Sequence, residues 1–159
     1  MTGAARSWAR AGGVLAAVLL VDQVTKVLVR SGIDVGEENP VLPAISLVHV
    51  KNRGVAFSAL EGQAGLVIAV IVVAIALLVA YFATHATRPL IWLPVGLLAG
   101  GAAGNIIDRV RDGAVTDFIK LPLWPAFNVA DVAITFGVLA LLAVFERAPE
   151  RTSGADGRA

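Results

Sequence analysis

The sequence predicts an all-α membrane protein: a bundle of four transmembrane helices, with a small β-sheet between the first and second spans. Three observations support this fold class. Hydrophobic residues make up 57% of the 159 residues and charged residues only 16%, with a mean hydropathy of +0.79, more apolar than an ordinary soluble domain. Four apolar runs are long enough to cross a bilayer as helices. The segment between the first two runs is instead rich in glycine, proline and β-branched residues.

The composition excludes several classes of function. A net charge of +1 without a basic stripe gives no surface for nucleic acid. The chain has no cysteine, so disulfides, thiolate metal sites and thiol nucleophiles are excluded. Its two histidines, His49 and His85, argue against a histidine-rich metal site.

The first span is predicted at residues 9–29. Arg6 and Arg10 precede the apolar stretch that begins at residue 11, as in a signal peptide. No small-residue cleavage site in a polar context follows, so we expect the span to be retained. Asp22 and Lys26 are one helical turn apart within this span and can form an ion pair. The alternative is an interfacial anchor in which the lysine extends toward the headgroups.

Residues 31–62 differ from the rest of the chain because glycines and prolines at 32, 36, 40 and 43 break helix. The stretch ISLVHVK at 45–51 has the β-branched enrichment of a short strand, and Asn-Arg-Gly at 52–54 predicts a turn. We therefore expect a small sheet on the membrane surface. His49 is predicted as a solvated strand position rather than a base. Asn52 is a candidate functional residue because it lies beside an apolar Val-Ala-Phe stretch.

The second and third spans are predicted at 64–82 and 90–107. In the third, Gly96, Gly100 and Gly104 recur every four residues, which lets another helix backbone approach closely. Asp108 continues this stripe by one turn. Asn105, Asp108 and Arg109 should therefore cluster at the packed end of the helix. The alternative is a polar helix terminus with a surface Asp–Arg pair.

The connector at 109–127 contains Asp117 within an apolar, strand-like patch at 115–118. The fourth span follows at 128–145, where Asn128 and Asp131 are three residues apart and share a helical face. The charged tail at 147–159 is predicted to be disordered, leaving one membrane domain at 1–146. Six Lys and Arg residues lie on the side of the termini and seven on the opposite side, so the positive-inside rule does not decide the orientation.

The candidate polar residues all fall on one side of the predicted membrane, and they limit the possible chemistry. Two carboxylates that share one proton fit these residue types, because one acid stays neutral while its partner activates water. Neighbouring Asn and Arg side chains can stabilise developing charge. Spacing alone leaves open which two of Asp108, Asp117 and Asp131 form the pair. The competing classes are a proton-coupled transporter, which a missing inverted repeat disfavours, and a noncatalytic scaffold, which leaves the clustered acids unexplained.

Five short motifs occur along the chain: DQVTK at 22–26, NRGVAF at 52–57, GGAAGNIIDR at 100–109, VTDF at 115–118 and FNVAD at 127–131. Together they resemble the motifs of lipoprotein signal peptidase (signal peptidase II), a family of four-span bacterial membrane aspartic peptidases. Each motif alone is weak, but five in this order on the expected spans are specific. The resemblance extends over nearly the whole chain.

The resemblance implies that Asp117 and Asp131 are the catalytic pair. Asp108 competes with Asp117 for the first of these two positions, because it too lies beside Asn105 and Arg109. It also implies supporting and substrate-contacting residues, namely Asn105, Asp108, Arg109 and Asn128, with Asp22, Lys26 and Asn52 around the site. The family's sheet is extracytoplasmic and cradles the substrate, which agrees with the strand predicted at 45–51.

The implied reaction is removal of the signal peptide from a diacylglyceryl-modified prolipoprotein, just before the lipidated cysteine. The implied location is the bacterial cytoplasmic (inner) membrane, with cytoplasmic termini and an extracytoplasmic active site. No metal or organic cofactor is implied. The expected partners are the prolipoprotein substrate and membrane lipid. We expect a monomer, because the chain contains its whole site.

Overall fold

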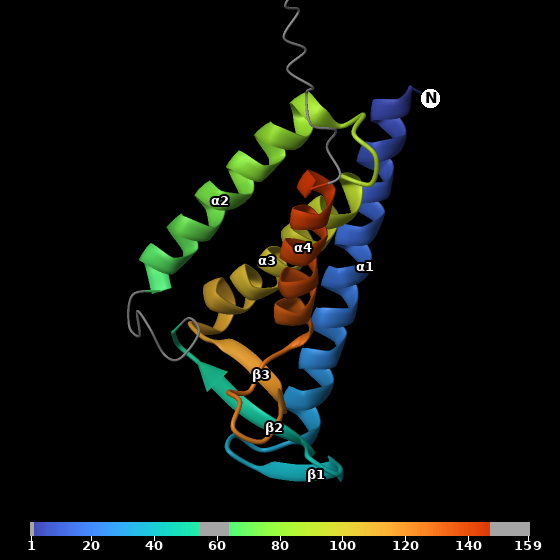
Figure 1. The fold of residues 1–159 in the computed structure, drawn as a ribbon. Coiled ribbons are helices and arrows are strands. Elements are labelled where there is room, and N and C mark those ends of the chain that lie inside the picture. Colours follow the sequence, from blue (N-terminus) through green and yellow to red (C-terminus); the bar gives the residue numbers. More distant parts are fainter. Residues whose placement is uncertain (1, 55–63, 147–159) are drawn as a thin grey trace, which may run out of the picture.

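The computed structural model describes residues 2–54 and 64–146. Within them the chain forms four helices and one three-stranded sheet (Figure 1). The elements in order are α1 (Gly3–Gly32), β1 (Glu38–Leu42), β2 (Ile45–Asn52), α2 (Ala64–His85), α3 (Trp92–Asp112), β3 (Val115–Lys120) and α4 (Val129–Glu146). The last part of the motif at 52–57 and the tail predicted at 147–159 lie outside the described residues.

The helices follow the apolar runs but differ from the predicted spans at their ends. The Thr2 hydroxyl accepts a hydrogen bond from the Ala5 amide at 3.2 Å and caps α1, so this helix starts earlier than predicted. α3 continues to Asp112 and ends at Gly113, which adopts a left-handed φ of 67°. Among the described helices, α1, α2 and α4 are long and apolar enough to cross a membrane.

The glycines of α3 let two helices pack directly against its backbone. A methyl group on Gly96 would lie 2.7 Å from the carbonyl oxygen of Ala11, and one on Gly100 would lie 2.9 Å from that of Leu15. The predicted close approach along this stripe is therefore confirmed, and the neighbour is α1. On another face of α3, a methyl group on Gly101 would lie 2.6 Å from the carbonyl oxygen of Ala130, in α4. α3 thus packs between α1 and α4.

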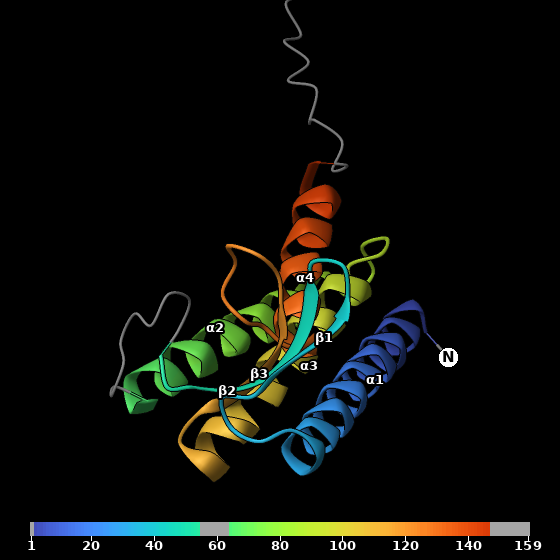
Figure 2. The ribbon, with the colours of Figure 1, turned by 90° about the horizontal axis from the view of Figure 1, so that it is seen from below.

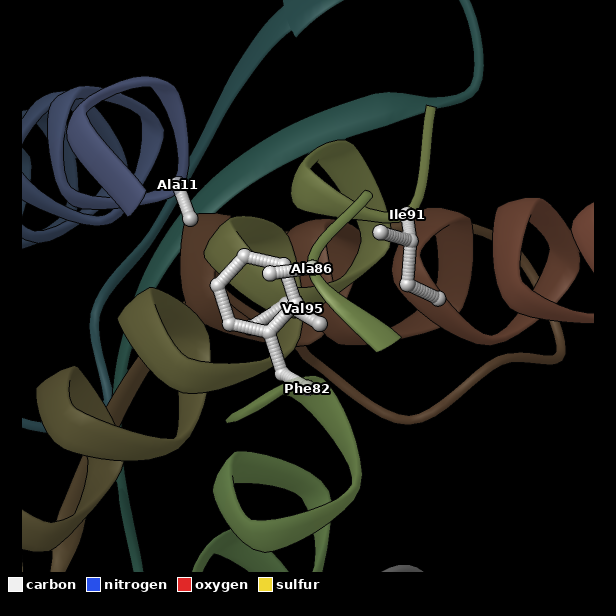
Figure 3. Packing of buried hydrophobic residues seen from close by; sticks show 5 residues of the cluster. All are labelled: Ala11, Phe82, Ala86, Ile91 and Val95. Carbon is white, nitrogen blue, oxygen red and sulfur yellow. The ribbon is translucent and has the colours of Figure 1, made fainter. Parts of the chain in front are cut away.

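The C-terminal end of α2 packs against α1 and α3. Phe82, Ala86, Ile91 and Val95 form a buried cluster with Ala11, which joins the end of α2 to α1 and α3 (Figure 3). From there α2 diverges from α1 toward the sheet (Figures 1 and 2). Large apolar side chains along α2 remain exposed, among them Leu66, Val70, Val72, Val73 and Leu77. Such a surface is suited to lipid rather than water.

The sheet has the order β1-β2-β3 with antiparallel pairing throughout. The sequence predicted a sheet formed only by the segment between the first two spans. In the structure, the third strand of the sheet comes from the connector between α3 and α4. The segment expected to be strand-like at 115–118 is therefore part of the same sheet. Its register pairs Val50 with Asp117 and Asn52 with Val115, which brings the end of β2 beside Asp117.

The prediction that His49 is solvated was wrong. The side chain is only 4% exposed, and its Nδ1 lies 2.8 Å from the carbonyl oxygen of Ile33. The β2–β3 register shifts between Leu47 and Val50, which interrupts the alternation of inward and outward residues. As a result, Val48 and His49 are both buried although they are consecutive.

Candidate active site

The polar residues singled out in the sequence meet where the sheet joins the start of α4 and the last turns of α3. β2 supplies Asn52, β3 supplies Asp117, and α4 supplies Asp131. Figure 1 shows this region at the end of the helices opposite the N-terminus.

The N-terminus of α4 is closed by a reciprocal pair of hydrogen bonds. The Asp131 amide donates to Asn128 Oδ1 at 2.9 Å, and the Asn128 amide donates to Asp131 Oδ2 at 3.2 Å. This is the arrangement of a capping box, which satisfies two amides that a helix start leaves unpaired. A third amide, that of Ala130, donates to Asp22 Oδ1 of α1 at 2.9 Å. The predicted common face of Asn128 and Asp131 is confirmed, and both residues cap the start of the helix.

The carboxylate of Asp117 is held by two amide side chains. Asn128 Nδ2 donates to its Oδ1 at 2.7 Å, and Asn52 Nδ2 donates to its Oδ2 at 2.9 Å. Asn52 is itself fixed because its Oδ1 accepts from the Gly54 amide at 3.0 Å, which confirms the predicted turn. Asp117 is only 2% exposed. This burial raises the pKa of Asp117 to about 6, against the opposing effect of the hydrogen bond from Asn52.

Asp131 is half-buried and linked to Asp117 through two asparagines. Its Oδ1 accepts a hydrogen bond from Asn105 Nδ2 at 2.9 Å. Asn105 Oδ1 in turn accepts from Asn128 Nδ2 at 3.2 Å, and Asn128 also binds Asp117. Each carboxylate therefore has an N–H donor on each of its two oxygens. The negative charge of Asp131 is also a secondary cause of the raised pKa of Asp117.

Both carboxylates line one cavity of about 480 Å³. Its walls come from three helices, from β2, and from the segment around β3 that leads into α4. The lining residues are Asn52, Ile71, Ala102, Asn105, Arg109, Val115, Asp117, Trp124, Pro125, Ala126, Phe127, Asp131, Ile134 and Thr135. The cavity therefore combines a polar group of residues with apolar walls, and it can hold an amide bond within an apolar chain.

Asp108, the competing acid, is bound differently and is not among the residues that line this cavity. It is 1% exposed. Its Oδ2 lies 3.1 Å from Lys26 Nζ and accepts from the Thr116 amide at 3.0 Å. Its Oδ1 lies 3.5 Å from Arg30 Nη1. The alternative of a surface Asp108–Arg109 pair is wrong, because Asp108 is buried and ion-paired with other cations.

Lys26 is fully buried, and its Nζ lies 2.9 Å from Asp22 Oδ2. The predicted Asp22–Lys26 pair is therefore confirmed, and the alternative of a lysine extended toward the headgroups is wrong. Nζ also donates to Asn105 Oδ1 at 3.0 Å, so this pair touches the hydrogen-bond network of the two carboxylates.

Arg109 donates to two backbone carbonyls, and it forms no ion pair with an acid in the part of the chain that the structure describes. Its Nη2 donates to the carbonyl of Gly54 at 2.9 Å and its Nη1 to that of Asn105 at 3.3 Å. It therefore holds the turn after β2 against α3 while lining the cavity.

Two residues of this network were not singled out from the sequence. Gln23 Nε2 donates to Asp22 Oδ2 at 3.1 Å and to Asp108 Oδ1 at 3.3 Å. Arg30 lies near Asp108 and donates to the Thr116 hydroxyl at 3.2 Å. Arg30 follows Lys26 by four residues, so the helical spacing that paired Asp22 with Lys26 could have identified it.

The arrangement supports acid–base chemistry by two carboxylates. Within residues 2–54 and 64–146, no group of three or more His, Cys, Asp and Glu side chains is placed to hold a metal ion. A buried acid whose pKa is raised to about 6, beside a more accessible carboxylate, can polarise a carbonyl in its protonated form while the second group deprotonates water.

The chain is similar to known proteins over most of its length. A model of the family described as signal peptidase (SPase) II matches residues 14–146. A lipoprotein signal peptidase of Moorella thermoacetica is 43% identical over 126 residues, which are 78% of this chain and 84% of that protein. One of Pelotomaculum thermopropionicum is 44% identical over 130 residues, covering 80% and 86%.

A solved structure described as a bacterial membrane enzyme has a similar fold. It superposes with a TM-score of 0.82 at 27% sequence identity, covering 91% of this chain and 92% of that one. A second structure with the same description has a TM-score of 0.73 at 28% identity, with coverages of 86% and 92%.

Proposed function

The chain belongs to the signal peptidase II family, and from that membership we propose that it removes signal peptides from diacylglyceryl-modified prolipoproteins by an aspartic mechanism. It is a hydrolase of lipoprotein processing and a multi-pass membrane protein. The proposed cut lies just before the lipidated cysteine, and the proposed catalytic pair is Asp117 and Asp131.

The observation that carries this assignment is that Asp117 and Asp131 line the same cavity and are joined through shared asparagines. Asp108 is instead ion-paired with Lys26 and Arg30 and is not among the residues that line this cavity, so it is not placed to activate water there. We assign Asp108, Asp22 and Lys26 to support of the site.

The two acids take different roles. Asp117 is buried and its pKa is raised to about 6, so it serves as the protonated acid that polarises the scissile carbonyl. Asp131 is half-buried in the first turn of α4. A helix N-terminus favours a negative charge, so Asp131 serves as the ionised base.

Hydrolysis then proceeds in two steps, after which each acid has returned to its starting protonation state. Water attacks the carbonyl carbon, Asp131 takes one water proton, and Asp117 gives its proton to the carbonyl oxygen. In the second step the carbon–nitrogen bond breaks and Asp131 passes its proton to the departing amine. Asp117 recovers a proton from one hydroxyl as the new carboxyl group forms. Asn52, Asn105 and Asn128 hold the two carboxylates in place, and Arg109 positions the turn at Gly54 and presents cationic charge to the cavity.

In the proposed membrane arrangement all four helices span the bilayer. α3 is the one of the four whose own sequence is not apolar enough to mark it as a membrane span. Its position between α1 and α4 supports this, because its polar and small residues then face protein instead of lipid. We place residues 1–146 in one membrane domain, with both termini and the tail at 147–159 in the cytoplasm. The site then lies on the outer side of the bacterial inner membrane, and the protein acts as a monomer.

A membrane-embedded substrate fits the divergence of α2. A signal-peptide helix and two acyl chains already lie in the bilayer, so they reach a site from the side. Ile71 of α2 and Ile134 of α4 are apolar walls of the cavity that contains both acids. These two helices therefore provide apolar surface that leads from lipid to the carboxylates.

The test is cleavage of a diacylglyceryl-modified prolipoprotein in detergent by the wild type and by Asp117→Asn, Asp131→Asn and Asp108→Asn, each checked for folding. Loss of activity by about three orders of magnitude or more is expected for the first two, with a milder loss for Asp108→Asn. Near-normal turnover by Asp117→Asn would overturn the pair as assigned. A well-folded wild type without any cleavage would favour the transporter or scaffold class.

A further inference from the structure

Lys26 has a place in the network that goes beyond ion pairing. All three of its ammonium hydrogens have acceptors: Asp22 Oδ2 at 2.9 Å, Asp108 Oδ2 at 3.1 Å and Asn105 Oδ1 at 3.0 Å. The side chain is 0% exposed and is not among the residues lining the cavity. It therefore acts from behind the site, without access to substrate.

The contact with Asn105 determines which way that amide faces. An ammonium group donates hydrogen bonds and accepts none, so Asn105 must present its oxygen to Lys26. Asn128 Nδ2 donates to the same oxygen at 3.2 Å. With Oδ1 held by these donors, Nδ2 of Asn105 points to Asp131 Oδ1 at 2.9 Å.

We infer that Lys26 is a positioning residue of the reaction, which uses the amide of Asn105 to fix a hydrogen-bond donor on the carboxylate of Asp131. This inference rests on the proposed role of Asp131 as the base. A reversed Asn105 amide would place its oxygen against the Asp131 carboxylate and its NH₂ group against two donors. Lys26 makes that reversed state unfavourable, so the base keeps a donor on each oxygen.

The two acids around Lys26 hold it in place for this task. The oxygen of Asp22 that does not contact Lys26 accepts from the Ala130 amide of α4. The Asp108 oxygen that contacts Lys26, Oδ2, also accepts from the Thr116 amide of β3. The ammonium is therefore fixed between groups that are themselves tied to the elements carrying Asp131 and Asp117. A cation with only one partner would not be oriented so closely.

The test must separate this role from the loss of a buried charge. Lys26→Met alone leaves Asp22 and Asp108 with less positive charge, and breaking a buried ion pair is strongly destabilising. The variant to use is therefore Asp22→Asn with Lys26→Met, which removes one charge of each sign. Asparagine keeps an oxygen acceptor for the Ala130 amide. Asp22→Asn with Lys26→Gln is the second such variant, since a neutral amide imposes no orientation on Asn105.

A double-mutant cycle with Asn105→Ala gives the decisive measurement. In the Asp22→Asn background, we expect Lys26→Met to lower kcat about 10- to 100-fold, with KM changed less than about 3-fold. This is less than the roughly 100- to 1,000-fold cost of removing a stabilising donor itself, because Asn105 is still present but no longer held in one orientation. Because Lys26 acts through Asn105, adding Asn105→Ala should lower kcat to the level of Asn105→Ala alone and no further. Lys26→Gln should behave as Lys26→Met does.

The inference would be overturned if the fold-losses in kcat caused by Lys26→Met and Asn105→Ala multiplied in the combined variant. It would also be overturned if a folded charge-balanced variant kept the kcat of the wild type. The matched control is Lys120→Met, which removes an ion-paired lysine from the exposed pair with Glu38 and should leave kcat unchanged. Asp117→Asn and Asp131→Asn in the same assay keep the two proposals apart. If either retains turnover, the aspartic mechanism fails, whatever the cycle shows.

Discussion

The buried Asp117 should make the protein less stable as pH rises, and Asp117→Asn should remove that dependence. Burial raises the pKa of Asp117 from 3.8 to about 6 in the folded protein. The folded state therefore holds a proton that the unfolded chain releases between these two values. A group with this shift favours folding at low pH, and its contribution declines as pH rises toward 6 and then levels off.

The size of the effect follows from the two pKa values. The linkage between proton binding and folding predicts that this one carboxyl group lowers the free energy of unfolding by about 1.4 kcal/mol between pH 5 and pH 8. Hydrogen-bond changes caused by the substitution, such as an amide NH₂ facing the donors Asn52 and Asn128, are present at both pH values. They cancel when the wild-type-to-variant difference at pH 5 is subtracted from that at pH 8.

Thermal unfolding in detergent at the two pH values measures this difference. The Tm of Asp117→Asn minus that of the wild type should be about 3–6 °C larger at pH 8 than at pH 5. The control is Val50→Ala, since Val50 pairs with Asp117 across the sheet but carries no charge. Its Tm difference should be the same at both pH values. A pH-independent Tm difference for Asp117→Asn, or one larger at pH 5, would refute the argument.

Two further predictions concern the start of α4 and its packing. Asn128→Ala removes the cap of α4 and a hydrogen-bond donor to Asp117. We expect the free energy of unfolding to fall by about 1 kcal/mol in a thermal unfolding assay, and kcat to fall by at least about 100-fold in a cleavage assay. Full activity of this variant would contradict the prediction. Gly101→Ala places a methyl group against the Ala130 backbone and should lower stability by about 1–3 kcal/mol. Gly13→Ala on α1, where nothing lies within 4 Å, is its control, and equal losses for both would count against the packing argument.

The sequence was sufficient for features that depend on neighbouring residues. Apolar runs predicted helices at α1, α2 and α4, and the four-residue spacing of Asp22 and Lys26 predicted their ion pair. The three-residue spacing of Asn128 and Asp131 predicted their common face. The motifs that resembled signal peptidase II also led to the family that the comparisons support.

Other features depend on residues far apart in the chain, and local patterns did not show them. β3 joins the sheet from a connector more than sixty residues beyond β2, so its partner cannot be deduced from its own sequence. The burial of His49 results from a register shift, which alternation of residue types does not predict. The cations that neutralise Asp108 come from α1, whereas the adjacent Arg109 binds backbone carbonyls.

The closure of the α4 N-terminus links assembly of the protein to its ability to cut other chains. Asp22 comes from α1, and it binds the amide next to Asp131; Asn52 must arrive from β2 to hold Asp117. A newly inserted chain with these parts still separate has neither acid fixed for proton transfer. We therefore expect the proposed peptidase to become active only after α1, β2 and α4 have assembled around the two acids.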